Sequence, residues 1–295
     1  MALDALRKYG LNVGRLATSG RYLMELPPAE ARAHLRAIED AGITNVWYGE
    51  TWGAEAFTFA QRLLYATERI VIGSGVIRAL ERGAKNAASA QWTILQEFPD
   101  RYILGLGASG DTRKQGKSPV QFLRDYLTEL DENTFRLTGS DVRYPRILGA
   151  YSTGTTTIGR DMCDGITTFL ITTEHTKWAR DLLGPEPFLT AGITVGIGND
   201  IEKYRAYGRK MLEYYLPLPH QINKYKNLGF SEQDYAPPGS DHLVDSLMAI
   251  GPIDVVAERL RQHLANGADQ VNVAFLGASP AEEIEHLGEL NRLLG

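Results

Sequence analysis

Residues 67–76 read TERIVIGSGV and residues 100–107 read DRYILGLG, and these two stretches decide the fold class. Each contains a short apolar run that ends at two closely spaced glycines. Such runs are typical of strands that are buried on both faces, as in parallel sheets. The Ala-rich residues 84–98 between them predict a helix, so this part of the chain alternates strand, helix and strand.

The same alternation extends outward in both directions along the chain. With residues 69–72 and 102–104 as strands, we predict six more strands, near 11–13, 45–48, 145–149, 165–170, 188–196 and 270–276. Two helix starts are marked by serine followed by proline, at Ser118-Pro119 and Ser279-Pro280, with Gln or Glu three residues after the serine. Eight strands that each precede a helix predict one TIM barrel domain, (β/α)8, over residues 1–295. A doubly wound sheet is the main alternative.

One long stretch departs from this alternation. Residues 216–240 read LPLPHQINKYKNLGFSEQDYAPPGS and are rich in Pro, Gly and Tyr. Long irregular segments in compact domains are often functional loops. We therefore predict an insertion at one end of the barrel, near the mouth of the pocket, where it forms part of a lid.

Composition excludes several classes of protein. The chain has 295 residues with 43% hydrophobic content, and 31 Lys and Arg against 36 Asp and Glu give a net charge of −5. This mild acidity gives no reason to expect nucleic acid or an anionic membrane as partner. The single cysteine, Cys163, excludes an internal disulfide and a CxxC zinc site, and no metal is expected. Without an 18-residue apolar run or a signal-peptide core, we expect a cytoplasmic enzyme that acts on a small molecule.

Two glycine-rich patterns resemble phosphate-binding loops but fail in detail. Residues 105–110 fit G-x-G-x-x-G, yet they follow the fourth predicted strand and open a polar loop instead of a helix. Residues 110–118 have one residue too many for a P-loop, and Pro119 removes an amide where phosphate would bind. The first pattern is better interpreted as a close backbone approach. The basic residues of the second are either an exposed loop or attract an anionic ligand tail.

Several segments together resemble a known family. They are EDAGITNVWYGET at 39–51, the two stretches at 67–76 and 100–107, Asp164-Gly165, Leu183-Gly184-Pro185 and GADQV at 267–271. In this order they resemble the bacterial-luciferase-like superfamily, and most closely its branch of oxidoreductases that use the deazaflavin coenzyme F420. The resemblance implies a TIM barrel with the cofactor at the carboxyl ends of the strands, usually in a homodimer. Other members use reduced FMN.

The resemblance also implies which residues hold the cofactor. It places a non-proline cis peptide at Gly75-Val76, with Ser74-Gly75 as the alternative, against the back of the flavin ring. The other expected contacts are Ala108, Ser109, Ala150 and Tyr151 along the ring, and Thr172, Thr173 and His175 at the phosphate, with Lys177 nearby. His175 also fits a plain first-turn residue of a helix capped by Thr173. The threonine-rich residues 152–157 depart from the family, so their helix starts late or their hydroxyls line the site.

At the end of the second strand, Glu50 and Thr51 stand where F420-dependent sugar-phosphate dehydrogenases of this superfamily carry Asp and His. Thr51 cannot act as a general base at neutral pH, so such a dehydrogenase is not expected, although Thr51 can donate a hydrogen bond. We expect Glu50 to exchange a proton with the substrate, with Trp47 and Trp52 lowering the local polarity and Trp52 touching the substrate. The alternative is a structural Glu50 at a helix start that Thr51 caps.

The resemblance therefore implies an oxidoreductase that moves a hydride between F420 and an unidentified small organic substrate. A two-component monooxygenase that uses reduced FMN and oxygen is the first alternative. The chemistry differs, because a deazaflavin lacks the N5 atom and cannot form the oxygen adduct. The second alternative is a non-catalytic flavin-binding relic.

Overall fold

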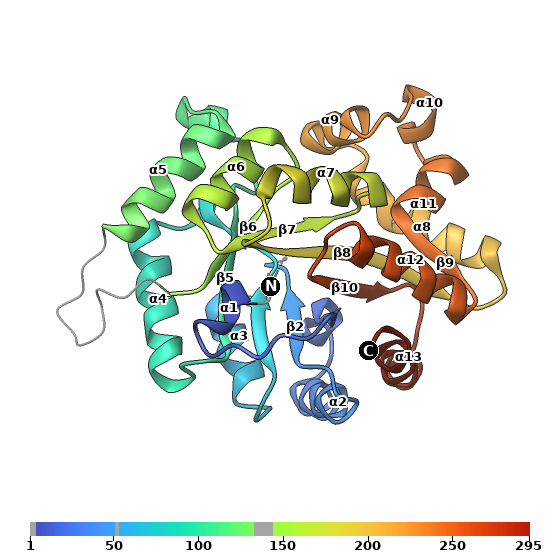
Figure 1. The fold of residues 1–295 in the computed structure, drawn as a ribbon, viewed down its shortest axis with the longest axis horizontal. Coiled ribbons are helices and arrows are strands. Elements are labelled where there is room, and N and C mark those ends of the chain that lie inside the picture. Colours follow the sequence, from blue (N-terminus) through green and yellow to red (C-terminus); the bar gives the residue numbers. More distant parts are fainter. Residues whose placement is uncertain (1–3, 51–52, 133–143) are drawn as a thin grey trace.

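A closed barrel of eight parallel strands forms the centre of the protein (Figure 1). The computed structural model describes residues 4–50, 53–132 and 144–295. The barrel order is β1-β2-β3-β5-β6-β7-β8-β10, and β10 pairs with β1 to close it. The barrel strands are β1 (Leu16–Ser19), β2 (Asn45–Tyr48), β3 (Val71–Ser74), β5 (Tyr102–Gly107), β6 (Arg146–Gly149), β7 (Gly165–Phe169), β8 (Phe188–Ile197) and β10 (Gln270–Phe275). The predicted TIM barrel is confirmed.

Helices surround the barrel, and short elements extend it. The flanking helices are α2 (Pro28–Asp40), α3 (Ala56–Leu64), α4 (Ala84–Glu97), α5 (Pro119–Asp131), α6 (Thr153–Met162), α7 (Thr173–Leu183), α8 (Ile201–Tyr215), α12 (Ile253–Ala265) and α13 (Pro280–Leu294). The remaining elements are α1 (Asp4–Arg7), α9 (Pro219–Asn227), α10 (Glu232–Tyr235), α11 (Asp241–Leu247), the short strands β4 (Ile77–Arg78) and β9 (Met248–Gly251), and the 3₁₀ turns η1 (Arg21–Met24), η2 (Ala79–Glu81) and η3 (Thr112–Gln115). Across the described ranges, no helix has the length and apolar character needed to cross a bilayer.

Local sequence patterns predicted most of the helices and strands correctly. The clearest error concerns the first strand of the barrel. Ser118 and Ser279 cap α5 and α13 as predicted, each accepting a hydrogen bond from the backbone three residues on. The first strand does not lie at 11–13. Leu11 and Val13 are buried against Leu6 in a small core, and the strand begins only at Leu16. Apolar residues that pack this core look the same in sequence as a buried strand.

The 216–240 segment is more regular than its composition predicts. Most of it folds into α9 and α10, which pack with α8 and α11 around a second hydrophobic core. Tyr225 and Leu212 are fully buried there, and Pro219 occupies the first turn of α9, where its missing N–H costs nothing. Figure 1 shows these helices as an orange group beside α7 and β8. The insertion is therefore a helical lobe with its own core.

Trp47 packs in the barrel interior and is only 2% exposed. Its indole Nε1 donates to Gln270 Oε1 at 2.7 Å, and a Cβ on Gly73 would come within 2.3 Å of its ring. Glycine at position 73 thus makes room for the ring. Trp47 thus belongs to the core, and its effect on the polarity around Glu50 stays a prediction.

Strands β3 and β5 approach each other unusually closely at one point. The Ser74 hydroxyl donates to the Gly105 carbonyl at 2.9 Å and accepts from the Gly105 N–H at 2.8 Å. A Cβ on Gly105 would lie 1.7 Å from the Ser74 carbonyl oxygen. The close backbone approach expected for residues 105–110 is thus confirmed at Gly105.

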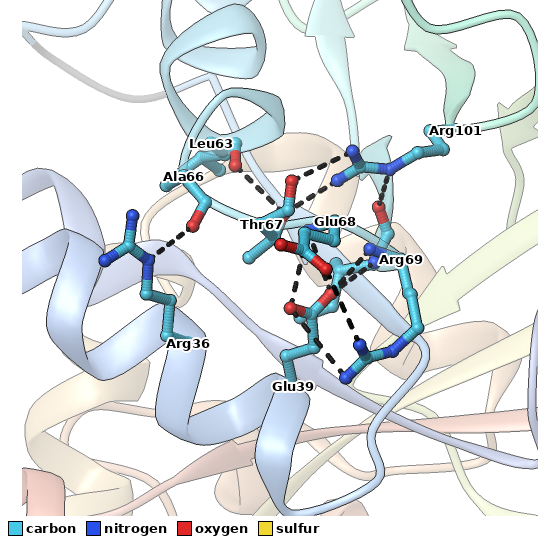
Figure 2. A network of polar contacts seen from close by, with 9 residues as sticks. Arg36, Glu39, Leu63, Ala66, Thr67, Glu68, Arg69 and Arg101 are labelled. Carbon is cyan, nitrogen blue, oxygen red and sulfur yellow. Dashed lines mark hydrogen bonds and ion pairs between the residues drawn. The ribbon is translucent and has the colours of Figure 1, made fainter.

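A polar network holds the opposite, amino end of the same two strands (Figure 2). The Glu39 carboxylate at the end of α2 accepts backbone N–H bonds from residues 68–70. Arg101 donates to the carbonyls of Thr67 and Ile70, each at 3.0 Å. Partial burial opposes ionisation, but the three backbone donors outweigh it and lower the pKa of Glu39. This network faces away from the carboxyl ends, so its role is stability.

The Gly105→Ala variant should lose about 3 kcal/mol of stability, because its methyl group cannot fit against the Ser74 carbonyl unless β3 and β5 separate. The matched control is Gly288→Ala in α13, where nothing lies within 4 Å of the added Cβ. There the change should stabilise the helix by about 0.5–1 kcal/mol. Urea unfolding of both variants measures the difference. Equal stability of the two variants would contradict the close approach.

The Glu39→Gln variant should lose roughly 1 kcal/mol of stability at pH 7, because three backbone donors lose their anionic acceptor. A lowered carboxyl pKa stabilises the fold above the ordinary pKa of about 4.5, and this contribution disappears as the pH falls through the folded-state value. The deficit should therefore shrink when unfolding is measured at pH 4. Glu68→Gln, whose side chain is 87% exposed, should change little at either pH. A deficit that stays constant with pH would refute this account.

Candidate active site

The peptide after β3 lies at the carboxyl end of the barrel, where catalysis occurs in this fold. The Gly75-Val76 bond is cis, which confirms the prediction. Gly75 is exposed and Val76 is half-buried. The Gly75 N–H donates to the Tyr48 carbonyl at 2.5 Å, and the Glu50 N–H donates to the Val76 carbonyl at 3.2 Å. These two bonds fasten the chain after β2 to the chain after β3.

Val76 rests on glycines from the two neighbouring strands. A Cβ on Gly107 would lie 2.9 Å from Val76 Cγ2, and a Cβ on Gly149 would lie 3.3 Å from its Cγ1. Any larger residue at the ends of β5 and β6 would therefore displace the valine. We call Gly75, Val76, Gly107 and Gly149 the mouth floor. It is a surface of small groups at the open end of the barrel.

The other residues expected along the ring divide into two groups. Ala108 is half-buried, and Ser109 is exposed with a φ of 47°. By contrast, the Ala150 N–H donates to the Thr167 carbonyl, and the Tyr151 N–H donates to Thr155 Oγ1 at 3.2 Å. The Ser74 hydroxyl is also committed, to Gly105. Ala108 and Ser109 thus offer accessible surface. The N–H groups of Ala150 and Tyr151 and the Ser74 hydroxyl, by contrast, already have hydrogen-bond partners within the protein.

The first turn of helix α6 supplies the acceptor for the Tyr151 N–H. Ser152 caps the helix, and Thr155 returns a bond to the Ser152 N–H in a capping box. The helix begins at Thr153, so the expectation of a late start is wrong. Thr155 acts at the cap, where threonine is favourable, and not in the helix interior.

Glu50 lies just after β2, and its carboxylate contacts the backbone of Arg78 and the side chain of Arg82. Its Oε2 accepts from the Arg78 N–H at 2.7 Å, and its Oε1 forms an ion pair with Arg82 Nη2. Arg82 Nη1 also pairs with Glu55 at 2.9 Å. The Glu50 side chain is 10% exposed, so it still reaches the surface of the site. Residues 51 and 52, expected to act in catalysis and substrate contact, lie outside the described residues.

A cavity of about 390 Å³ opens beside this ion pair. It lies between η2, the start of α4 and α5, and its lining includes Arg82, Lys117, Asp125 and Tyr126. Lys117 pairs with Asp125 at 2.7 Å, so part of the positive charge expected to attract an anionic tail is neutralised. The Tyr126 hydroxyl has no hydrogen-bond partner in the described chain, and burial raises its pKa. The cavity thus offers Arg82 and a neutral hydroxyl to a bound molecule.

The predicted phosphate region forms around the start of α7. Thr172 is its N-cap and accepts from the His175 N–H at 3.3 Å, so the expectation that Thr173 caps the helix is wrong by one residue. His175 Nε2 lies 3.3 Å from the Tyr151 carbonyl, and burial lowers the pKa of this histidine. Lys177 points away from this region, because it pairs with Asp181 and is 64% exposed.

A different lysine reaches this region, and the sequence interpretation missed it. Lys224 of α9 is 5% exposed, and its Nζ donates to the Phe169 carbonyl at 3.2 Å. The same nitrogen lies 4.9 Å from the ring centroids of Tyr151 and Tyr225. Burial lowers the pKa of Lys224 to about 7. The signal in the sequence was the helical spacing of Gln221, Lys224 and Tyr225 after Pro219, within a stretch interpreted as a loop.

These groups surround the mouth floor from two directions. The Glu50 and Arg82 pair comes from the loops after β2 and β4, and the His175 and Lys224 group lies over the ends of β6 and β7. Such an arrangement can place an apolar ring on the floor with a carboxylate at one edge and basic side chains at another. It is suited to holding two small molecules in contact and moving a proton between them and the protein.

Comparison with known proteins was made on both sequence and structure. The profile of the family described as luciferase-like monooxygenase matches residues 12–270. A protein of Mycobacterium tuberculosis (strain H37Rv) named "Putative coenzyme F420-dependent oxidoreductase Rv3520c" is 24% identical over 99% of this chain and 79% of its own length.

Two solved structures share the fold at low identity. An F420-dependent secondary alcohol dehydrogenase in complex with an F420-acetone adduct superposes with a TM-score of 0.75, at 12% identity, over 96% of this chain and 100% of that one. The oxygenating constituent of the 3,6-diketocamphane monooxygenase of Pseudomonas putida, in complex with FMN, gives 0.66 at 12% identity over 96% and 97%. At this identity the likeness concerns the fold. The profile match over most of the chain shows that this protein belongs to the luciferase-like monooxygenase family.

Proposed function

We propose that this protein is an oxidoreductase that transfers a hydride between coenzyme F420 and a small organic substrate. The observation that carries the proposal is the mouth floor, where Val76 lies on Gly107 and Gly149 at the open end of the barrel. A flat ring requires such a surface of small residues. The F420 in the names of the mycobacterial relative and of the alcohol dehydrogenase structure supports the choice of cofactor.

The residues around the floor fit a deazaflavin. Gly75 and Ser109 are exposed beside Val76, and Ala108 adds a small side chain at the same edge. The buried Nδ1 of His175 has no hydrogen-bond partner within the described chain. This nitrogen lies near the expected phosphate end of the cofactor and is available to a ligand. We assign the ring to Ser74, Gly75, Val76, Ala108, Ser109, Ala150 and Tyr151, and the phosphate to Thr172, Thr173 and His175. When bound, F420 supplies or accepts the hydride at its C5 position.

In this proposal the protein moves the proton that accompanies the hydride. Glu50 is the carboxylate nearest the carboxyl end of β2, and Arg82 and the Arg78 N–H fix its two oxygens. A carboxylate held in this way can exchange a proton with a substrate seated over the floor. Thr51 would donate a hydrogen bond and Trp52 would contact the substrate. Arg82 acts as a positioning residue through Glu50. The working enzyme would be a cytoplasmic homodimer.

An FMN-dependent monooxygenase is the second candidate, and the FMN-bound neighbour favours it. The mouth floor would accept either tricyclic ring. The chemistry separates the two, because only a flavin with N5 forms the adduct with oxygen. A non-catalytic flavin-binding protein is less well supported, since Glu50 is fixed by an ion pair just after β2 and a cavity of about 390 Å³ opens beside its partner Arg82.

F420 should bind to the wild type with saturation, and at least about tenfold more tightly than FMN, in parallel fluorescence titrations. The variant Val76→Phe should weaken F420 binding by at least about tenfold, because its ring would occupy the floor. Val255→Phe on the exposed face of α12 is the matched control and should bind like the wild type. Tight FMN binding with oxygen-dependent turnover would instead support the monooxygenase.

The Glu50→Gln variant should lower kcat by about 10²–10⁴-fold, because the amide cannot exchange a proton, while F420 affinity changes little. The measurement is single-turnover oxidation of reduced F420 by an acceptor with a polarised double bond. Glu55→Gln is the control, since Glu55 pairs with the same Arg82 but caps α3. Turnover of Glu50→Gln within threefold of the wild type would make Glu50 a structural residue.

A further inference from the structure

Lys224 is a buried lysine that makes no ion pair with a carboxylate of the described residues. Its side chain is 5% exposed, and its Nζ has one hydrogen bond, to the Phe169 carbonyl. Within the described chain it makes no ion pair with any carboxylate. An ammonium group has three N–H donors, so two of them are left without protein acceptors. Burying a charge in this way is costly unless something pairs with it.

Three buried polar atoms on residues near Lys224 have no hydrogen-bond partner among the described residues. They are His175 Nδ1, the Tyr225 hydroxyl and Gln221 Oε1, on side chains that are 9%, 0% and 7% exposed. Tyr225 and Gln221 lie on α9 beside Lys224, and the charge of Lys224 helps to lower the pKa of His175 after the larger effect of burial. Folded proteins leave few buried polar atoms unpaired, so three of them on residues next to Lys224 point to a ligand-binding position.

The chemistry of this cluster selects the ligand. The titratable groups that act on Lys224 or that it acts on are His175, His220, Tyr151 and Tyr225. None of these is an acid at neutral pH, and burial raises the pKa of both tyrosines, which keeps their hydroxyls as donors. The Gln221 amide can turn its NH₂ toward an acceptor. Ammonium, hydroxyl and amide donors on neighbouring positions of α9 match an oxyanion.

We propose that Lys224 and Tyr225 of α9, next to His175, form a buried subsite at the carboxyl ends of β6 and β7 that binds an oxyanion, a carboxylate or phosphate group. The subsite deepens the proposed function, because it lies next to the start of α7 and next to Tyr151, at the edge of the expected cofactor site. The oxyanion belongs either to the cofactor phosphate or to an acidic group of the substrate. In either case α9 of the 216–240 insertion contributes a ligand-binding residue.

Sulfate and acetate serve as probes of the subsite, and isothermal titration calorimetry measures their affinity for the whole protein. The wild type should bind sulfate at pH 6, and the affinity should fall at least tenfold by pH 8.5, because the amine must be protonated to hold the anion. Lys224→Met should bind sulfate at least tenfold more weakly. Lys226→Met is the control on the same helix, 52% exposed, and should stay within twofold of the wild type.

A stability measurement tests whether Lys224→Met is correctly folded. Because burial disfavours the ammonium form, Lys224→Met should have a Tm at pH 6 equal to or above that of the wild type. If this variant is unstable, Lys224→Gln replaces it with the same expectation for sulfate. Absence of sulfate and acetate binding to the wild type, or unchanged binding to a folded Lys224 variant, would overturn the proposal.

Two further titrations identify the source of the oxyanion. If it is the cofactor phosphate, sulfate competes with F420 but not with a deazaflavin riboside that lacks phosphate, and Lys224→Met weakens only F420 binding. If it is a substrate group, sulfate and F420 bind together and Lys224→Met leaves F420 affinity unchanged. Sulfate binding that depends on Lys224 in a protein that binds no F420 would uphold the subsite and refute the proposed function.

Discussion

The close contact of β3 with β5 sets the shape of the barrel mouth. Ser74 and Gly105 exchange hydrogen bonds across a gap that leaves no room for a Cβ on the glycine. This contact draws the ends of the two strands together, so that Val76 falls on Gly107 two residues further on. The mouth floor, and with it the proposed site for the cofactor ring, therefore follows from backbone packing deeper in the barrel.

Charge is distributed unevenly around this floor. On the side of β2, Arg82 pairs with both Glu50 and Glu55 in a connected network. On the side of β6 and β7, Lys224 and His175 are buried with no acid among them. Ion pairs of this kind hold their side chains in place, whereas a buried lysine that pairs with no carboxylate of the described residues lowers stability when it is charged. In the proposed function, Arg82 of the first group positions Glu50 for proton exchange, and Lys224 of the second recognises an anionic group.

The helical lobe of α8 to α11 explains how a lysine from an insertion reaches the barrel. The second hydrophobic core packs Tyr225 and Leu212 together and fixes α9 against the end of β7. Lys224 precedes Tyr225 on the same buried side of the helix, so its side chain is directed at Phe169 and Tyr151. A rigid support of this kind is what a precise binding residue requires.

The sequence by itself determined what depends on neighbours along the chain. Runs of buried strand residues placed the barrel, and serine followed by proline placed the starts of α5 and α13. The resemblance to the family located the cis bond at Gly75-Val76. These features depend on backbone conformation and local hydrogen bonds, which short sequence patterns encode.

Only the tertiary structure decided the features that depend on distant contacts. In the structure, Leu11 and Val13 belong to a core and not to a strand, and Thr172 is the N-cap of α7. The Tyr151 N–H donates its hydrogen bond to Thr155 Oγ1. The tertiary structure also joined Lys224 to Phe169, 55 positions away in the chain. Burial and the identity of a partner are set by packing between elements, so no local pattern marks a lysine as buried beside the barrel mouth.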